Sequence, residues 1–61
     1  MKAFLFLIYC ETYCQGWEDS HIYKLVNHTS EELAERHLRA SLEEDREIGE
    51  IHHIENLTIG L

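Results

Sequence analysis

The chain has 61 residues, enough for one small domain that buries only about 60 % of the surface exposed by its unfolded form. Twelve acidic residues against five Lys and Arg give a formal net charge of −7, which argues against nucleic-acid polymers and anionic membranes as partners. No stretch approaches the ~20 apolar residues of a membrane-spanning helix, and the apolar N-terminus lacks a small-residue cleavage site, so we expect a cytoplasmic protein.

The most apolar stretch of the chain is its beginning, Ala3-Phe4-Leu5-Phe6-Leu7-Ile8-Tyr9. A continuous apolar run of this length predicts a strand that is covered on both faces, over about residues 2–10. Alternate side chains point to opposite sides of a strand, so the even and odd positions of this run each need their own cover. We therefore expect it to be the central strand.

A second strand is predicted over about residues 19–27, because residues 20–26 are again rich in apolar types. Gln15-Gly16 between the two strands fits a two-residue hairpin turn. This turn would place Cys10 opposite His21 and Ile8 opposite Tyr23. A wider loop over residues 12–19 is the alternative.

The clearest local signal is a helix over about residues 30–44. Thr29 with Glu32 forms a capping box and predicts Thr29 as the N-cap. The acidic run after residue 42 predicts that the helix stops near Glu44. Two oppositely charged i,i+4 pairs are expected on its exposed face, Glu32 with Arg36 and Glu35 with Arg39. The apolar stripe at helical spacing comprises Leu33, Ala34, His37, Leu38, Ser41 and Leu42.

A third strand is predicted over about residues 48–59, with a bulge or bend near His52-His53, where the apolar side changes. The result is an α+β chain with one small ββαβ domain spanning residues 1–61. Its sheet is expected to have the strand order 2-1-3, with the first strand antiparallel to both neighbours. One helix covers one face, so we expect the other face to serve oligomerisation.

Cysteine and histidine are frequent, but their spacing does not favour metal or catalysis. In an extended strand Cys10 and Cys14 would lie ~13 Å apart, too far to share an ion or to form a disulfide. Cys10 with His21 offers a nucleophile and a base, but no glycine-rich loop accompanies them. We therefore expect free thiols, no metal, no cofactor and no enzymatic activity.

Aromatic side chains gather along the predicted hairpin, with Tyr9 near them. Tyr and Trp are favoured at half-buried interfaces and ligand sites, although they also cap small cores. A stacking site for a flat, nucleotide-like ligand is the sharper interpretation. Its predicted residues are Tyr13, Trp17, His21, Tyr23 and, as the cation, Lys24.

In general profile the chain is similar to the small accessory proteins of phages and mobile elements, which are short, acidic and act by binding. The leading hypothesis is a non-catalytic binding protein, a homodimer or larger homo-oligomer, that inhibits or sequesters a target such as a small nucleotide-like ligand held between subunits. One alternative is a small thiol or zinc-dependent protein that uses Cys10 and His21. Another is an inhibitor that docks on a basic host protein through the helix acids Glu31, Glu32, Glu35, Glu43 and Glu44.

Overall fold

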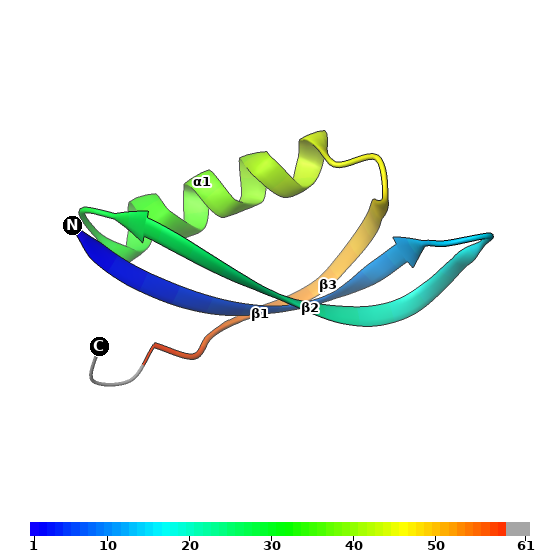
Figure 1. Cartoon of the computed structure of the whole chain (residues 1–61), viewed down its shortest axis with the longest axis horizontal. Helices are drawn as coiled ribbons and strands as arrows, with labels where there is room; N and C mark the ends of the chain where they lie inside the picture. The colour runs from blue at the N-terminus through cyan, green and yellow to red at the C-terminus, as the bar shows by residue number, and fades with distance from the viewer. Residues whose placement is uncertain (59–61) are drawn as a thin grey trace.

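The computed structural model describes residues 1–58 and shows a three-stranded sheet with one helix on it (Figure 1). The elements in chain order are β1 (Lys2–Tyr13), β2 (Trp17–His28), α1 (Glu31–Glu44) and β3 (Ile48–Asn56). The sheet order is β2-β1-β3, and β1 is antiparallel to both neighbours. The predicted α+β ββαβ fold and its 2-1-3 order are therefore confirmed.

The hairpin is longer than predicted and its register differs by one residue. β1 and β2 pair without a break from Lys2↔His28 to Tyr13↔Trp17, which leaves a three-residue loop, Cys14-Gln15-Gly16. Gln15 and Gly16 take φ values of 64° and 142°, the left-handed region that glycine tolerates best. The two-residue turn predicted from the sequence is therefore wrong, because Cys14 also belongs to the loop.

This register assigns the β2 side chains to the two faces of the sheet. Shifting a strand by one residue turns each of its side chains to the other face. Ile8 now pairs with Ile22 and not with Tyr23, and Cys10 pairs with Ser20 and not with His21. The even positions of both strands therefore face α1, and the odd positions face away from it.

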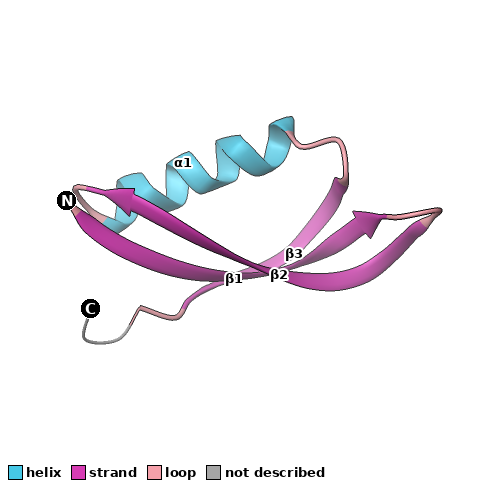
Figure 2. Cartoon of the chain, viewed as in Figure 1, coloured by secondary structure: helices cyan, strands magenta, loops and turns pink. Residues whose placement is uncertain are grey.

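The core lies between α1 and the even positions of β1, as the layers of Figure 2 indicate. Its helix side is a single i, i+4, i+8 row, Ala34, Leu38 and Leu42, with at most 3 % of each residue exposed. The wider stripe predicted from the sequence is only partly used, because Leu33, His37 and Ser41 are exposed. The β1 side consists of Phe4, Phe6, Ile8 and Cys10, with Ile22, Val26, Ile48, Ile51 and Ile54 packed partly buried around them.

The helix begins one residue later than predicted. Ser30 is the N-cap, and its Oγ accepts a hydrogen bond of 3.3 Å from the Leu33 backbone N–H. Thr29 instead donates its own N–H to Nδ1 of His28, at 2.9 Å. The helix ends at Glu44 as predicted.

The two predicted i,i+4 charge pairs form on the exposed side of α1. The Glu32–Arg36 and Glu35–Arg39 pairs have N–O distances of 3.6 and 3.8 Å. All four side chains are about half exposed or more, so water screens both pairs and each contributes little to stability.

β3 pairs with β1 in an interrupted register, which confirms the predicted bulge. Tyr9 pairs with His53 and the next residue, Cys10, pairs with Ile51, so His52 is the extra residue. A second break follows before Thr12↔Ile48. The strand predicted to residue 59 ends at Asn56 within the described residues, and residue 59 lies outside them.

The chain continues along β1 after β3 ends. The Leu57 N–H donates to the Leu5 carbonyl oxygen at 2.7 Å, and the Leu5 N–H donates to Oγ1 of Thr58 at 2.8 Å. Over residues 1–58, no helix is long and apolar enough to cross a membrane.

Replacing Ser30 with Ala should lower the free energy of unfolding by about 1 kcal/mol, because the Leu33 N–H loses its cap. Thr29→Ala is the matched control and should cost less, since the Thr29 hydroxyl contacts only the exposed His28 ring. Urea unfolding followed by circular dichroism measures both. A larger loss of unfolding free energy for Thr29→Ala than for Ser30→Ala would mean that Thr29 is the N-cap.

Candidate functional site

The face of the sheet away from α1, called the outer face here, is the candidate site. It is formed by the odd positions of β1 and β2 together with the β3 residues paired to them. No described helix or strand packs on it; Leu7 is buried on this face, at 8 % exposure, but other large apolar side chains remain exposed there. The exposed fractions are 41 % for Tyr9, 51 % for Tyr13, 53 % for Trp17, 59 % for Tyr23 and 63 % for Leu25.

Aromatic rings cross the middle of the outer face in a continuous row. The Tyr9 ring of β1 lies between His21 of β2 and His53 of β3, with centroid distances of 6.2 and 6.1 Å. The His53 ring is stacked on it, with 29° between the planes. Tyr23 extends the row, with its ring 6.1 Å from that of His21 in an edge-on arrangement. All three strands therefore contribute to one surface of flat side chains.

A second aromatic pair lies at the hairpin end, which extends past the helix in Figure 1. Tyr13 and Trp17 have ring centroids 5.3 Å apart. The Trp17 ring also reaches across to β3, because a Cβ added at Gly49 would lie only 2.9 Å from its Cζ3 atom. Such a Cβ would also lie 3.2 Å from the Glu11 Cβ. Gly49 thus makes room for Trp17, which has a packing role here despite its exposure.

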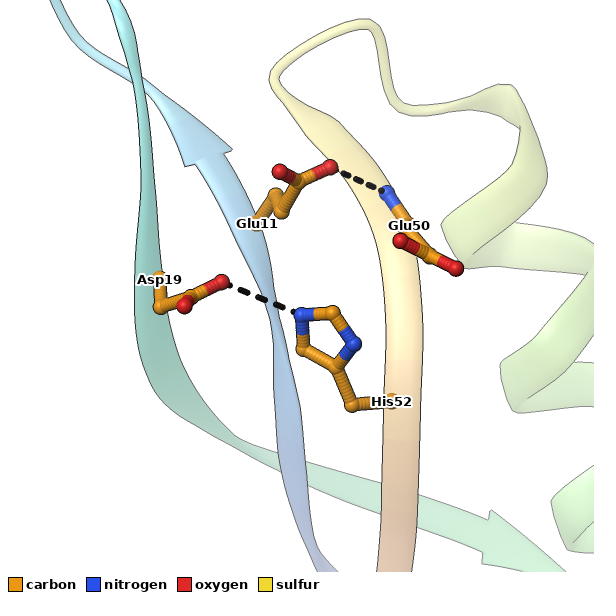
Figure 3. Close-up of polar contacts among 4 residues, drawn as sticks. All are labelled: Glu11, Asp19, Glu50 and His52. Atoms are coloured by element: carbon orange, nitrogen blue, oxygen red, sulfur yellow. Dashed lines mark hydrogen bonds and ion pairs between the residues drawn. The ribbon is translucent and has the colours of Figure 1, made fainter.

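Two polar contacts connect the strands between these aromatic groups (Figure 3). Nε2 of His52 lies 3.1 Å from Oδ1 of Asp19, so that β2 and β3 are linked across β1. The Glu50 backbone N–H donates to Oε1 of Glu11 at 3.3 Å. The bulge explains the first contact, because it allows adjacent histidines to share the outer face while Ile51 keeps its place in the core.

The structure places four of the five predicted ligand-binding residues on the same face of the sheet, in two separate pairs. Tyr13, Trp17, His21 and Tyr23 all lie on the outer face, at odd positions of the hairpin. Lys24 does not, because it pairs with Phe6 on the helix side. Sequence reasoning missed His52 and His53, although the change of apolar side at this doublet signalled the bulge that places them.

The charge of the outer face is acidic. The odd positions of β1 and β2 contain no Lys or Arg, and neither does β3. Glu11, Asp19 and Glu55 lie among its side chains. A phosphate group would therefore meet no permanent cation here, and a flat ring is the better-matched part of a nucleotide-like ligand.

The cysteines do not join this surface. Cys10 is fully buried against α1, whereas its predicted partner His21 lies on the outer face, so the Cys10–His21 pair does not form. Both cysteines are free, and Cys14 is exposed in the hairpin loop. Burial raises the pKa of the Cys10 thiol by desolvation. Within residues 1–58, no three His, Cys, Asp or Glu side chains are grouped so that they could hold a metal ion.

Comparison of the chain with protein-family models, with curated proteins and with solved structures gives no match. We therefore infer function from the outer face, with its exposed rings and acidic charge.

Replacing Gly49 with Ala should lower the free energy of unfolding by about 1 kcal/mol, because the new methyl group overlaps the Trp17 ring. The half-exposed Trp17 ring can shift, so the loss of unfolding free energy should lie near the lower end of the range for overpacked sites. Urea unfolding followed by circular dichroism measures it. In a Trp17→Ala background the same Gly49→Ala change should cost much less, and an equal cost in both backgrounds would contradict the contact.

The two thiols should differ in reactivity. In the folded protein an alkylating reagent should modify Cys14 and leave Cys10 unmodified, because the Cys10 thiol is buried and its raised pKa keeps it protonated. Intact mass should show one label before and two after denaturation. Two labels in the folded protein would contradict the burial, and none without reductant would indicate a disulfide.

The raised pKa also fixes the sign of one pH effect. Above the ordinary thiol pKa, the unfolded chain loses the Cys10 proton while the folded chain still holds it. Cys10 should therefore make the free energy of unfolding fall as the pH rises through this alkaline range. Cys10→Ala should reduce that fall, as measured by urea unfolding at several alkaline pH values.

Proposed function

We propose that the protein is a non-catalytic binding protein that acts as a homo-oligomer, with the outer face joining the subunits and holding a flat ligand between them. The observation that carries the proposal is the unequal cover of the sheet. α1 buries the even positions of β1, while Tyr23, Leu25 and the other outer-face aromatics stay exposed. Such a protein would work by sequestering its ligand or by inhibiting a target.

The size of the outer face supports self-association. A contiguous exposed apolar patch of several hundred Å2 is about the largest that a soluble monomer carries. Covering roughly 500 Å2 on each of two subunits reaches the ~1,000 Å2 that a specific interface needs. At about 25 cal/mol per Å2 this offers on the order of 25 kcal/mol before the costs of association are subtracted.

The outer face divides into two regions with different chemistry. Near the chain start, Leu5 pairs with Leu25 and the buried Leu7 pairs with Tyr23, while Glu55 of β3 pairs with Leu7 on its other side. Toward the hairpin, Glu11 pairs with Asp19 between the aromatic groups. The apolar region suits contact between subunits, and the hairpin region suits a ligand at the edge of that contact.

The ligand supported best is a flat ring that needs no phosphate contact. Stacking of a base on an aromatic side chain contributes about 1–3 kcal/mol, and it depends little on which base is bound. Tyr13, Trp17 and His21 offer such surfaces, and a neutral or positively charged ring would not be repelled by the neighbouring acids. Lys24 has no part in this site.

The alternative of docking on a basic protein surface has weaker support from the helix. Two of its acids already face arginines of the same helix, Glu32 at Arg36 and Glu35 at Arg39. These pairs reduce the acidic character that would attract a basic partner. The outer face has no such compensation from Lys or Arg.

Sedimentation velocity at micromolar concentration tests the proposal. The protein should sediment as a dimer of about 14 kDa, twice the 7.2 kDa of one chain, or as a larger closed assembly. Leu25→Lys should shift it to the monomer, because it places a charge in the apolar region. Leu33→Lys is the matched control, since Leu33 is an exposed leucine on α1 and its replacement should leave the assembly intact.

The same runs can include adenosine and adenosine monophosphate as ring and ring-plus-phosphate probes. Adenosine should sediment with the protein, and the monophosphate should bind no more tightly, because the face lacks Lys and Arg. A monomer of about 7 kDa for the wild-type chain would overturn the oligomer. Tighter binding of the monophosphate would overturn the proposed ligand chemistry.

A further inference from the structure

A groove lies between β2 and α1, on the side of the sheet opposite to the outer face. It has a volume of about 320 Å3 and is lined by the consecutive β2 residues 24–27 and by His37, Leu38 and Ser41 of the helix. This volume is at the lower limit of the volumes typical of ligand-binding pockets. Leu25 of the proposed subunit contact also lines the groove, but Lys24 and the helix residues take no part in that contact, so a site there would be a separate function.

The strand beside the groove is a free edge of the sheet. The order β2-β1-β3 leaves one side of β2 without a neighbour among residues 1–58. The backbone N–H and C=O groups along such an edge can pair with an added strand. β2 offers this edge over 12 residues, from Trp17 to His28.

The two edges of the sheet differ in how well they could accept a strand. Proteins shield edges with proline, with bulges, with short strands or with charged side chains, especially Lys. β3 has 9 residues and two register breaks, so its edge is irregular. β2 pairs with β1 without a break over its full length, and the chain has no proline. β2 therefore presents the longer and more regular edge.

The groove offers two kinds of contact to the side chains of an added strand. Its apolar part includes Val26, which is partly buried, and Leu38, which is 2 % exposed. Its charged part is Lys24, an exposed side chain on the same side of β2 as Val26 and two positions before it. Alternate residues of an extended strand face the same side, so an apolar residue and an acidic one two positions apart would match both.

We propose that this groove binds an extended peptide segment of a partner protein, which adds to the edge of β2 as a fourth strand. An apolar side chain of the segment packs over Val26, with the almost fully buried Leu38 behind it. A carboxylate two positions away contacts the ammonium group of Lys24, the only Lys or Arg of β2. His37 and Ser41 add hydrogen-bonding groups on the helix side. The partner is thus an acidic, extended peptide rather than a folded basic surface.

Selection from a phage-displayed library of random peptides on the immobilised full-length protein tests this inference. The selected peptides should share an apolar residue two positions from Asp or Glu. Binding of one synthetic selected peptide should protect β2 backbone amides from hydrogen exchange. Lys24→Glu should lower the affinity for this peptide by about tenfold, because the charge pair becomes a like-charge contact.

The chain provides a matched control, because its other lysine, Lys2, lies outside the groove. Lys2→Glu changes the net charge equally and should leave the affinity within about twofold. Repeating the selection on the Lys24→Glu variant should enrich Lys or Arg in place of the acidic residue. This reversal would not follow from unfolding of the variant.

Several results would overturn the inference. They are selection without enrichment, selected peptides without the acidic preference, equal weakening by the two lysine variants, and protection confined to amides outside β2. A change in the sedimentation of Lys24→Glu, together with failed selection, would assign the edge of β2 to a second copy of the chain.

Discussion

The structure depends on one contact, the packing of the Ala34-Leu38-Leu42 row of α1 on the even positions of β1. These side chains are almost fully buried, and they belong to elements far apart in the sequence. A row with i, i+4, i+8 spacing is narrow and covers only one face of a three-stranded sheet. β1 is apolar on both faces, so the same contact that completes the core leaves Tyr9 and its neighbours uncovered. The aromatic outer face is thus a consequence of having one helix.

The hairpin loop decides what that outer face contains. With Cys14, Gln15 and Gly16 in the loop, Ile22 and Val26 turn toward α1 while His21, Tyr23 and Leu25 turn away. A loop shorter by one residue would bury the aromatic set and expose the isoleucine and valine. The left-handed conformations of Gln15 and Gly16 therefore have an effect along the whole of β2. The bulge at His52 likewise decides which β3 side chains lie on the outer face. It lets His52 and His53 join that face while Ile51 stays in the core.

Charge separates the two candidate surfaces. The outer face has carboxylates and histidines with no Lys or Arg on its strands, whereas the groove beside β2 has Lys24. One surface therefore suits flat rings or a second subunit, and the other suits an acidic extended chain. The two edges of the sheet also differ. The β2 edge is regular and can readily accept a further strand, whereas the β3 edge is interrupted. Both proposed functions are binding functions, and they use opposite faces of β2, with Leu25 shared between them.

The sequence by itself determined the elements and their order. The apolar run of residues 3–9 specified a central strand and with it the order β2-β1-β3. The crossover made the two outer strands parallel, and the spacing of Ala34, Leu38 and Leu42 specified a helix. These features could be predicted because periodicity and connection rules act locally or through chain order. The aromatic content of the hairpin was also visible, and four of the five residues predicted from it lie on the outer face.

Only the tertiary structure decided the register and the helix cap, and with them the site. A two-residue and a three-residue hairpin loop are both compatible with Gln15-Gly16, and the difference of one residue moves Lys24 from one face to the other. Thr29 and Ser30 are both good N-caps, and the structure uses Ser30, while the Thr29 N–H bonds to His28. In each case the local preferences were nearly equal. The packing of β2 and α1 against β1 selected between them, because only one arrangement buries Ile22 and Val26 together with Leu38.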